Sequence, residues 1–237
     1  MSAKKPIAIF DIDGTIFRSS LILELFKKLT VRGVISKNAV AKVKESEARW
    51  LDRTGNYDDY MWASVNSFRK EITGKSKQKV VAASKEVIAE LKYRTYRFTL
   101  DLLNRIRKKY FTIAISGSIH EVVSEYNKFL KFDKIYATEM GVDEKRRYTG
   151  TVLHEPPKYK KELIIRYMQS HDLSLKNSVG VGDTESDIGF LEVVDNPIAF
   201  NPNRKLAEVA RHNGWPIVIE RKDLIVQLSK SIKILNI

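Results

Sequence analysis

The sequence predicts an α/β protein in which a doubly wound parallel sheet carries a helical segment inserted after its first strand. Short continuous apolar runs recur along the chain, and amphipathic helical patterns lie between most of them. Strands that helices cover on both faces have this continuous apolar character, because neither face meets water. Residues 18 to about 98 contain almost no such run, which marks the insert. A chain of 237 residues is long enough for one core with a smaller inserted part.

The predicted strands are six apolar runs, each of which ends in small or polar residues. In chain order they are IAIF at 7–10, FTIAIS at 111–116, KIYAT at 134–138, SVGVGD at 178–183, PIAFN at 197–201 and PIVIE at 216–220. Two segments between them, 120–130 and 160–171, place apolar residues at helical spacing. Segment 143–158 is predicted to form a small β-hairpin near the carboxyl edge of the sheet.

The insert is predicted to be helical and basic. Its helices break at VRGVIS (31–36), RTGNYDD (53–59) and TGKSK (73–77). It carries 18 Lys and Arg against 9 Asp and Glu, a net charge of +9 in a chain whose net charge is +13. The pattern predicts a core of residues 1–17 and 99–237 and an insert of residues 18–98.

Composition excludes several kinds of chemistry. The chain has no cysteine, so it has no disulfide, thiol nucleophile or cysteine metal site, which agrees with a reducing compartment. The first apolar run is too short for a signal peptide, and no segment has the length to cross a membrane. The four histidines, His120, His154, His171 and His212, lie far apart without the spacing of metal ligands. We therefore expect a cytoplasmic protein with no membrane partner, whose oligomeric state the sequence leaves open.

The first predicted strand leads directly into two aspartates, in IAIFDIDGTIF at 7–17. Carboxylates at the end of a buried strand are costly unless a partner compensates them. Doubly wound sheets bind ligands outside the carboxyl ends of their strands, where Asp11 and Asp13 are predicted to lie. Residues i and i+2 of an extended chain point the same way, so both carboxylates are expected to face one small volume, with Gly14 allowing a sharp turn. The alternative, that both only cap the next helix, explains one acid better than two.

A second pair of acids follows the predicted strand 178–183. Asp183 ends that strand, and Asp187 lies one turn into the following helix. Acids at two strand ends repel each other unless a cation lies between them. Hard oxygen ligands of this kind suit Mg²⁺, which often bridges carboxylates and a substrate phosphate. The sequence therefore favours a Mg²⁺ site, with a helix N-cap as the alternative role of Asp183.

A third strand end has the composition of a phosphate-binding turn. Ser116, Gly117 and Ser118 are predicted to lead from a strand into a helix. A hydroxyl and free backbone N–H groups at a helix N-terminus bind phosphate, although serine at a helix start also acts simply as a cap.

Lysines gather at the start of another predicted helix. The segment PPKYKKEL contains Lys158, Lys160 and Lys161. One of them would neutralise a phosphate or a carboxylate, and a solvated basic turn is the alternative for any one lysine taken alone.

Together these four elements resemble the motifs of the haloacid dehalogenase superfamily of hydrolases, in the same order. DIDGT at 11–15 resembles the first motif, Ser116 in ISGS the second, a lysine of 158–161 the third and GDTESD at 182–187 the fourth. The resemblance covers 7–17 and about 100–220, most of the predicted core. It implies a Rossmann-like core, and the insert resembles the helical cap of that superfamily. ATEMGVDEKRRYTGTV and NPIAFNPNRKLAEVARHNGWPIV resemble subfamily IB, the branch that includes the phosphoserine phosphatases.

The resemblance implies a Mg²⁺-dependent phosphomonoesterase that hydrolyses a small phosphorylated metabolite through an aspartyl-phosphate intermediate. Asp11 would be the nucleophile, and Asp13 the general acid for the leaving alcohol and then the general base for water. Asp11, the backbone carbonyl of Asp13 and Asp183 would hold Mg²⁺. Asp187 would support the metal site or the lysine.

The same resemblance assigns the phosphate-binding residues. Ser116 and the Gly117 N–H would bind phosphoryl oxygens, and a lysine would offset the charge of nucleophile and phosphate. We choose Lys160, because YKKEL places it at the opening of its helix. Lys158 follows two prolines, and Lys161 points about 100° around the helix from Lys160.

The nature of the substrate is less well defined by the sequence. Asp13 argues against dehalogenation, because a halide leaves without needing a proton. Phosphoserine phosphatases carry a glutamate soon after the first motif that binds the amine of their substrate. Here Ser20 stands at that position and Glu24 lies one turn later, so phosphoserine is possible but not favoured. Arg18 and the basic insert suggest a small anionic substrate with charge beyond its phosphate. The aromatic residues of the insert are expected mostly to pack its own core, with the lining of a pocket as the alternative: Trp50, Tyr57, Tyr60, Trp62 and Phe68.

Two other functions remain open at this stage. A phosphotransferase or phosphomutase would use the same intermediate. A basic nucleic-acid-binding protein with a vestigial phosphatase core would explain the net charge of +13. Nucleic acid is disfavoured as a partner, because no known nucleic-acid-binding signature stands out and every catalytic position is filled.

Overall fold

The computed structural model describes residues 4–228. The strands are β1 (Lys5–Asp11), β2 (Phe111–Ile119), β3 (Lys134–Val142), β4 (Tyr148–His154), β5 (Leu173–Gly182), β6 (Asn196–Phe200), β7 (Ile217–Arg221) and β8 (Leu224–Leu228). The α-helices are α1 (Leu21–Val31), α2 (Lys37–Leu51), α3 (Tyr57–Ile72), α4 (Lys77–Leu91), α5 (Arg97–Ile106), α6 (His120–Leu130), α7 (Lys160–Gln169), α8 (Ile188–Leu191) and α9 (Arg204–Asn213). Two short 3₁₀ helices are η1 (Pro156–Lys158) and η2 (Glu185–Asp187).

The described strands form one eight-stranded sheet in the order β4-β3-β2-β1-β5-β6-β7-β8. The six central strands, β3, β2, β1, β5, β6 and β7, pair in parallel with their neighbours in this order. Strands β4 and β8 pair antiparallel at the two edges. The fold class is therefore the predicted one. All six predicted strands and both predicted helices are present. Edge strand β8 was not predicted from the sequence.

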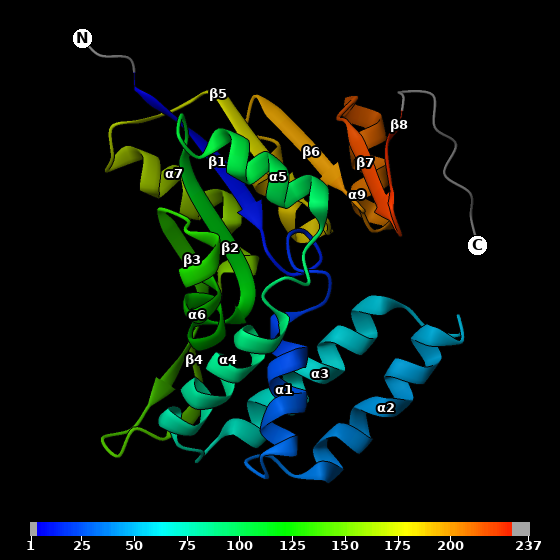
Figure 1. Cartoon of the computed structure of the whole chain (residues 1–237), viewed down its shortest axis with the longest axis vertical. Coiled ribbons are helices and arrows are strands. Elements are labelled where there is room, and N and C mark those ends of the chain that lie inside the picture. The colour runs from blue at the N-terminus through cyan, green and yellow to red at the C-terminus, as the bar shows by residue number, and fades with distance from the viewer. Residues whose placement is uncertain (1–3, 229–237) are drawn as a thin grey trace.

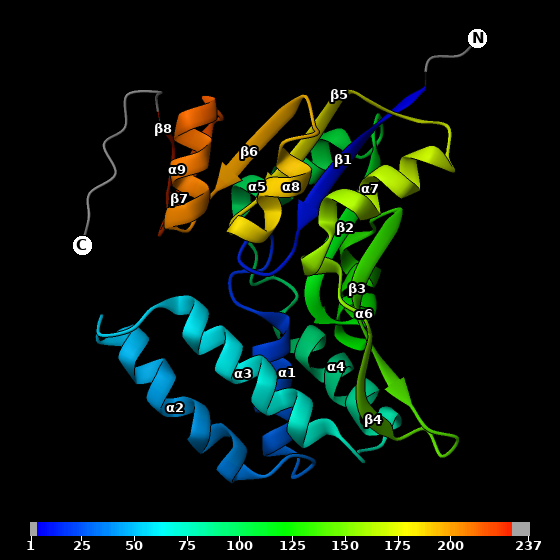
Figure 2. The ribbon, with the colours of Figure 1, turned by 180° about the vertical axis from the view of Figure 1, so that it is seen from behind.

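The two faces of β1 explain its continuous apolar run. Ile7 and Ile9 pack in a cluster with residues of α7, α8 and α9, whereas Ala8 and Phe10 pack in a larger cluster with residues of α5 and α6. Figure 1 shows α5 in front of the sheet, and Figure 2, seen from behind, shows α7, α8 and α9 on the opposite face. Because both faces of this strand are covered, every residue of the run is apolar.

Helices α1 to α4 follow one another between β1 and β2 and lie beyond the ends of the central strands (Figure 1). The connections between these four helices fall where the sequence predicted breaks. Their interior is packed, with the Phe26 and Phe68 ring centroids 6.0 Å apart. Helix α5 begins at Arg97, inside the last two residues of the predicted insert, and packs on the sheet through the buried Leu103.

The predicted hairpin at 143–158 is only partly correct. The structure forms a hairpin from β3 and β4, so residues 143–147 are its turn and Pro156–Lys158 is a 3₁₀ helix. The first arm was missed because β3 continues past Thr138, and its second half pairs with β4 instead of β2.

The hairpin also pairs with the loop between α3 and α4. Gly74 N–H donates to the Tyr148 carbonyl at 2.7 Å, Tyr148 N–H to the Lys75 carbonyl at 3.0 Å, and Lys77 N–H to the Arg146 carbonyl at 2.9 Å. The loop after α3 is therefore attached to β4, and the start of α4 to the turn of the hairpin, by backbone hydrogen bonds.

Within residues 4–228, no helix combines the length and the apolar character needed to cross a lipid bilayer.

Candidate active site

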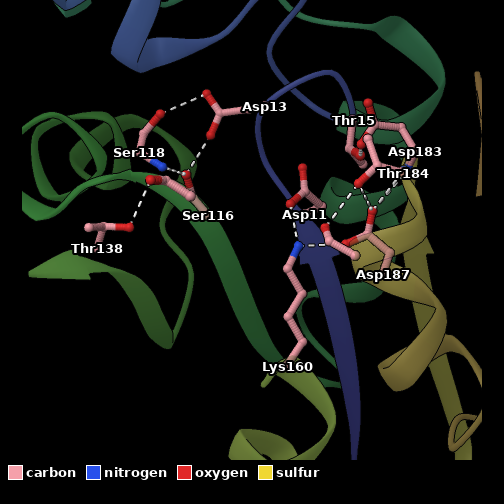
Figure 3. Close-up of polar contacts among 12 residues, drawn as sticks. Asp11, Asp13, Thr15, Ser116, Ser118, Thr138, Lys160, Asp183, Thr184 and Asp187 are labelled. Carbon is pink, nitrogen blue, oxygen red and sulfur yellow. Dashed lines mark hydrogen bonds and ion pairs between the residues drawn. The ribbon is translucent and has the colours of Figure 1, made fainter. Parts of the chain in front are cut away.

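The candidate site lies where β1, β2 and β5 end. Figure 3 shows two groups of polar side chains there. Asp11 belongs to a group around Lys160, whereas Asp13 belongs to a group around Ser116. The parallel pairing of β1 with β2 and with β5 brings these strand ends to one edge of the sheet.

Lys160 occupies the centre of the first group. Its Nζ lies 2.7 Å from Asp11 Oδ1 and 2.5 Å from Asp187 Oδ1, and its side chain is 1% exposed. A buried ammonium is costly unless charged partners surround it. The negative charges of Asp11 and Asp187 outweigh the burial and raise the pKa of Lys160, so it stays charged.

The three candidate lysines are clearly separated by the structure. Lys158 pairs with Glu155, and its side chain is 64% exposed. Lys161 pairs with Glu192 at 3.2 Å, and its side chain is 41% exposed. Of the three, Lys160 is the one that reaches Asp11.

Asp187 joins the Lys160 group to the end of β5. Its Oδ2 accepts hydrogen bonds from the backbone N–H groups of Asp183 and Thr184, each at 3.0 Å. A Cβ on Gly182 would lie 2.4 Å from the Asp187 Cβ, so only glycine leaves room for this side chain. Asp187 thereby holds both Lys160 and the turn that carries Asp183.

The Asp183 carboxylate faces the turn after β1. Its Oδ1 accepts a hydrogen bond from Thr15 Oγ1 at 3.2 Å. A Cβ on Gly14 would lie 2.0 Å from Asp183 Oδ2, and Gly14 has φ +83°. Glycine is therefore required there both for the backbone conformation and for the approach of the carboxylate.

Burial and mutual repulsion oppose the ionisation of these acids. Burial, with the negative charges of Asp187 and Asp13, raises the pKa of Asp11, although the Lys160 ammonium opposes the rise. Burial, with the charges of Asp11 and Asp187, raises the pKa of Asp183 well above its usual range. The group carries more negative than positive charge, which favours a cation at this place.

The side chain of Asp13 points away from Asp11. Its Oδ2 accepts from Ser116 Oγ at 2.5 Å, and its Oδ1 accepts from Ser118 Oγ at 3.0 Å and from the Leu21 N–H at 2.5 Å. Burial raises the pKa of Asp13 in spite of these three hydrogen bonds. Strand β1 ends at Asp11, and the chain turns after Asp13, where the Gly14 N–H donates to the Phe17 carbonyl at 3.0 Å. The negative charge of Asp13 still contributes to the raised pKa of Asp11, and the expectation that both carboxylates face one small volume stays a prediction.

Ser116, Gly117 and Ser118 precede a helix, as predicted. Strand β2 continues to Ile119, and α6 begins at His120. Ser116 Oγ accepts from the Ser118 N–H at 3.0 Å, so this turn is closed by its own side chain. A Cβ on Gly117 would lie 3.2 Å from Pro157 Cγ, which places η1 against this strand end.

A divalent cation fits the donors present. Asp11 Oδ2 is buried and has no hydrogen-bond partner, as expected of an oxygen that serves a cation. Within residues 4–228, no cluster of three or more His, Asp or Glu side chains has a metal-binding arrangement. The carboxylates of Asp11 and Asp183 are the candidate side-chain ligands, and oxygens of the backbone, water or substrate would complete a Mg²⁺ site.

Tyr57, the first residue of α3, brings the insert close to this site. Burial and the negative charges of Asp183 and Asp13 raise its pKa. Its ring packs on Trp50, with the centroids 5.1 Å apart, and the residue is 37% exposed. Tyr60 and Phe68 are buried in the insert as expected, whereas Trp62 is exposed.

Three polar contacts of the site were not assigned from the sequence. Thr15 holds Asp183, Ser118 holds Asp13, and Thr184 binds Asp187 through its N–H. All three residues lie inside the quoted motifs. Their closeness in sequence to the site residues was the signal that could have identified them. Their partners depend on turns that sequence spacing does not define.

The sequence profile of the haloacid dehalogenase-like hydrolase family matches residues 8–192. The phosphoserine phosphatase of Methanocaldococcus jannaschii is 26% identical over 229 residues, which cover 94% of this chain and 96% of that protein. A protein of Streptomyces azureus named inhibition of morphological differentiation protein is 25% identical over 221 residues, covering 92% and 79%.

Solved structures agree on the fold. A structure described as a phospho-aspartyl intermediate analogue of phosphoserine phosphatase superposes with a TM-score of 0.62 at 21% identity. The superposition covers 93% of this chain and 95% of the other. The two proteins therefore share their fold over both the core and the inserted helices.

Proposed function

The chain belongs to the haloacid dehalogenase-like hydrolase family, and we propose that it is a Mg²⁺-dependent phosphomonoesterase acting on a small phosphorylated metabolite through an aspartyl phosphate. The observation that carries this proposal is the Lys160 ammonium, buried between Asp11 and Asp187. A lysine in this position orients the Asp11 carboxylate and offers positive charge to an approaching phosphoryl group. The phosphoserine phosphatase relative supports hydrolysis of a phosphate ester.

In the first step, an Asp11 carboxylate oxygen attacks the phosphorus of the ester, and the bond from phosphorus to the leaving oxygen breaks. Asp13 donates a proton to that oxygen, so that an alcohol leaves. The raised pKa of Asp13, which burial causes, favours the protonated form that this step needs.

In the second step, water attacks the phosphorus of the aspartyl phosphate, and the ionised Asp13 accepts a proton from that water. The bond between phosphorus and Asp11 breaks, inorganic phosphate leaves and the Asp11 carboxylate is restored. The Ser116 hydroxyl and the Gly117 N–H bind phosphoryl oxygens in both steps, and Lys160 remains charged beside them.

Asp11, Asp183 and the backbone carbonyl of Asp13 would hold the Mg²⁺ ion, with Asp187 holding Lys160 and the turn at Asp183. The partnerless Asp11 Oδ2 and the raised pKa values of Asp11 and Asp183 support this assignment. When bound, Mg²⁺ offsets the charge of these carboxylates and of the phosphate.

The helices of residues 18–98 are proposed to be a cap over a core of residues 1–17 and 99–237. The position of Tyr57 near the acids of the site supports this role. A cap of this kind excludes water from the reacting phosphate and selects the leaving group.

The side chains after β1 favour a substrate other than phosphoserine. Ser20 is buried and carries no charge. Glu24 is already engaged, because its Oε1 accepts from Ser19 Oγ at 2.9 Å and lies 3.3 Å from the Arg94 guanidinium and 3.7 Å from Lys27 Nζ. An ammonium group on the substrate would thus find no free carboxylate on the first turn of α1.

A panel of phosphorylated metabolites, assayed for phosphate release with and without Mg²⁺, tests the proposal. We expect Mg²⁺-dependent release from several small esters and weak activity on phosphoserine. Product analysis with water as the only acceptor separates a hydrolase from a phosphotransferase. Absence of phosphate release from every ester, with the purified protein folded, would contradict the proposed function.

A further inference from the structure

Helix α3 of the insert makes an ionic contact with the chain segment that leads to Lys160. Arg69, in the last turn of α3, pairs its guanidinium with Glu155 Oε1. The side chains of Arg69 and Glu155 are only 22% and 14% exposed. Glu155 follows β4 directly and begins the segment 155–159, which we call the link, between β4 and Lys160.

The link is held tightly by its own hydrogen bonds. Lys158 N–H donates to the Glu155 carbonyl and Tyr159 N–H to the Pro156 carbonyl, both at 3.1 Å. The Tyr159 hydroxyl accepts from the Glu155 N–H at 3.1 Å and lies 2.7 Å from His154 Nδ1. Its two prolines further restrict the backbone of the link. A displacement of Glu155 is therefore expected to shift the whole link together.

The middle of the link and the residue that follows it touch the candidate site. Pro157 packs against Gly117, and the residue after the link is Lys160, whose Nζ holds Asp11. The position of Glu155 therefore bears on the phosphate-binding strand end and on the lysine.

The end of α3 that carries Arg69 is itself fixed. The Thr73 hydroxyl donates to the Arg69 carbonyl at 3.1 Å, and the loop that follows pairs with β4 through Gly74 and Tyr148. Arg69 thus reaches Glu155 from a defined place.

We propose that Arg69 and Glu155 are positioning residues, through which the insert sets the placement of Lys160 and Gly117 for phosphoryl transfer. The proposal rests on the proposed function for its catalytic part. Neither side chain touches the reacting atoms, so their effect is transmitted by the link.

Lys158 provides a matched control. It pairs with the other oxygen of the same carboxylate, Glu155 Oε2, at 2.7 Å. Its side chain is 64% exposed and belongs to the link itself, so its loss leaves the connection to α3 intact.

The experiment compares Arg69→Gln, Arg69→Lys, Glu155→Gln and Lys158→Gln in the full chain. We expect Arg69→Gln to lower kcat about tenfold with little change in KM, because misplacement of a charged group affects the transition state more than substrate binding. Arg69→Lys should recover part of the loss, and Lys158→Gln should keep kcat near that of the wild type. The double variant Arg69→Gln/Glu155→Gln should be no worse than Glu155→Gln alone, because the two residues act through one contact.

Hydrogen exchange of the backbone amides in 155–160 gives a readout that does not depend on activity. Arg69→Gln should speed exchange in the link, and Lys158→Gln should speed it less. Unchanged exchange in the link, or equal effects of Arg69→Gln and Lys158→Gln on kcat, would overturn the inference. A wild type without phosphatase activity would contradict the proposed function, whereas the exchange data alone decide whether α3 holds the link.

Discussion

Asp11 occupies a place where its own charge is unfavourable. It shares a buried site with the carboxylates of Asp183 and Asp187 and with one ammonium, Lys160, and its pKa is raised. Replacement by Asn keeps the shape of the side chain and removes one negative charge. We expect Asp11→Asn to lose turnover by a factor of about 10³ or more, because an amide cannot attack phosphorus.

The same variant has a test in stability. In metal-free buffer, Asp11→Asn should unfold at the same or a higher temperature than the wild type, because one source of repulsion is gone. Added Mg²⁺ should raise the melting temperature of the wild type and have a smaller effect on the variant. Turnover of Asp11→Asn near that of the wild type would contradict the proposed aspartyl-phosphate mechanism.

Lys160 is the second residue with a defined energetic role. Lys160→Ala removes the ammonium between Asp11 and Asp187, and loss of one partner from a buried ionic group costs about 3–5 kcal/mol. We expect a large loss in both kcat and the free energy of unfolding, measured by steady-state kinetics and denaturant titration. Lys161→Ala is the control, because its partially exposed pair with Glu192 should contribute less than about 1 kcal/mol. The reverse order of effects would show that the lysine is wrongly assigned.

Glu155 gives a pH dependence with a definite sign. Partial burial opposes its ionisation, but hydrogen bonds and charges from Lys158 and Arg69 outweigh burial and lower its pKa below the usual 4.5. The unfolded state then binds more protons than the folded state, so the contact stabilises the fold above pH 4.5 and is lost as pH falls through the lowered pKa. The difference in unfolding free energy between wild type and Glu155→Gln should shrink over that acid range. A difference that grows with acidity would contradict the assignment.

The β3–β4 hairpin joins the insert at one glycine in particular. Gly150 has φ +85°, and a Cβ there would lie 2.6 Å from Thr73 Oγ1. Gly74 has φ +77°, and nothing lies within 4 Å of where its Cβ would be. Alanine at position 74 would therefore have the same backbone strain as alanine at position 150 but no steric contact. We expect Gly150→Ala to lower the free energy of unfolding more than Gly74→Ala, whose cost should be about 1–2 kcal/mol. Denaturant titration measures both.

A second substitution isolates the contact. Thr73→Ala removes the side-chain atoms that the new Cβ would meet, so Gly150→Ala should be less harmful in that background. Equal costs in the two backgrounds would mean that hairpin and insert do not press on each other at this point.

The sequence predicts much of this arrangement because strands buried on both faces and acids at their ends leave clear local patterns. Lys160, chosen from the sequence among three lysines, contacts Asp11, and Asp187 joins Lys160 to the backbone of Asp183. The hydrogen-bond partners of Asp13 were not predicted, since they depend on the turn after β1 and on the N-terminus of α1. The pairing of Arg69 with Glu155, 86 residues apart, leaves no local pattern at all.

The charge of the whole molecule bears on how substrate arrives. Some cations of the insert are paired at the surface, as Lys28 is with Glu90, but the insert keeps an excess of +9. Exposed charges act over roughly 8 Å at physiological salt. For a multiply charged phosphate ester, kcat/KM should therefore fall as salt rises, and a singly substituted aryl phosphate should respond less.

Neutralising exposed lysines of α2 tests this prediction. Lys37→Gln/Lys44→Gln should flatten the salt response and leave kcat unchanged, because the change affects association and not chemistry. If kcat/KM is independent of salt and the protein binds oligonucleotides firmly, the basic surface serves nucleic acid instead.

The position of β1 at the centre of the sheet has a consequence for how the chain acquires its native state. Asp11 is synthesised early, but its partner Lys160 lies 149 residues later in the chain. Thr15 and its partner Asp183 are 168 residues apart. Parallel pairing over such separations is slow, because the long loops must close before contacts are gained. A nascent chain that has passed β2 but not β5 holds a central strand with one open edge. The inserted helices depend on local contacts and should form first. Recovery of activity after dilution from denaturant should therefore lag behind the recovery of helix content.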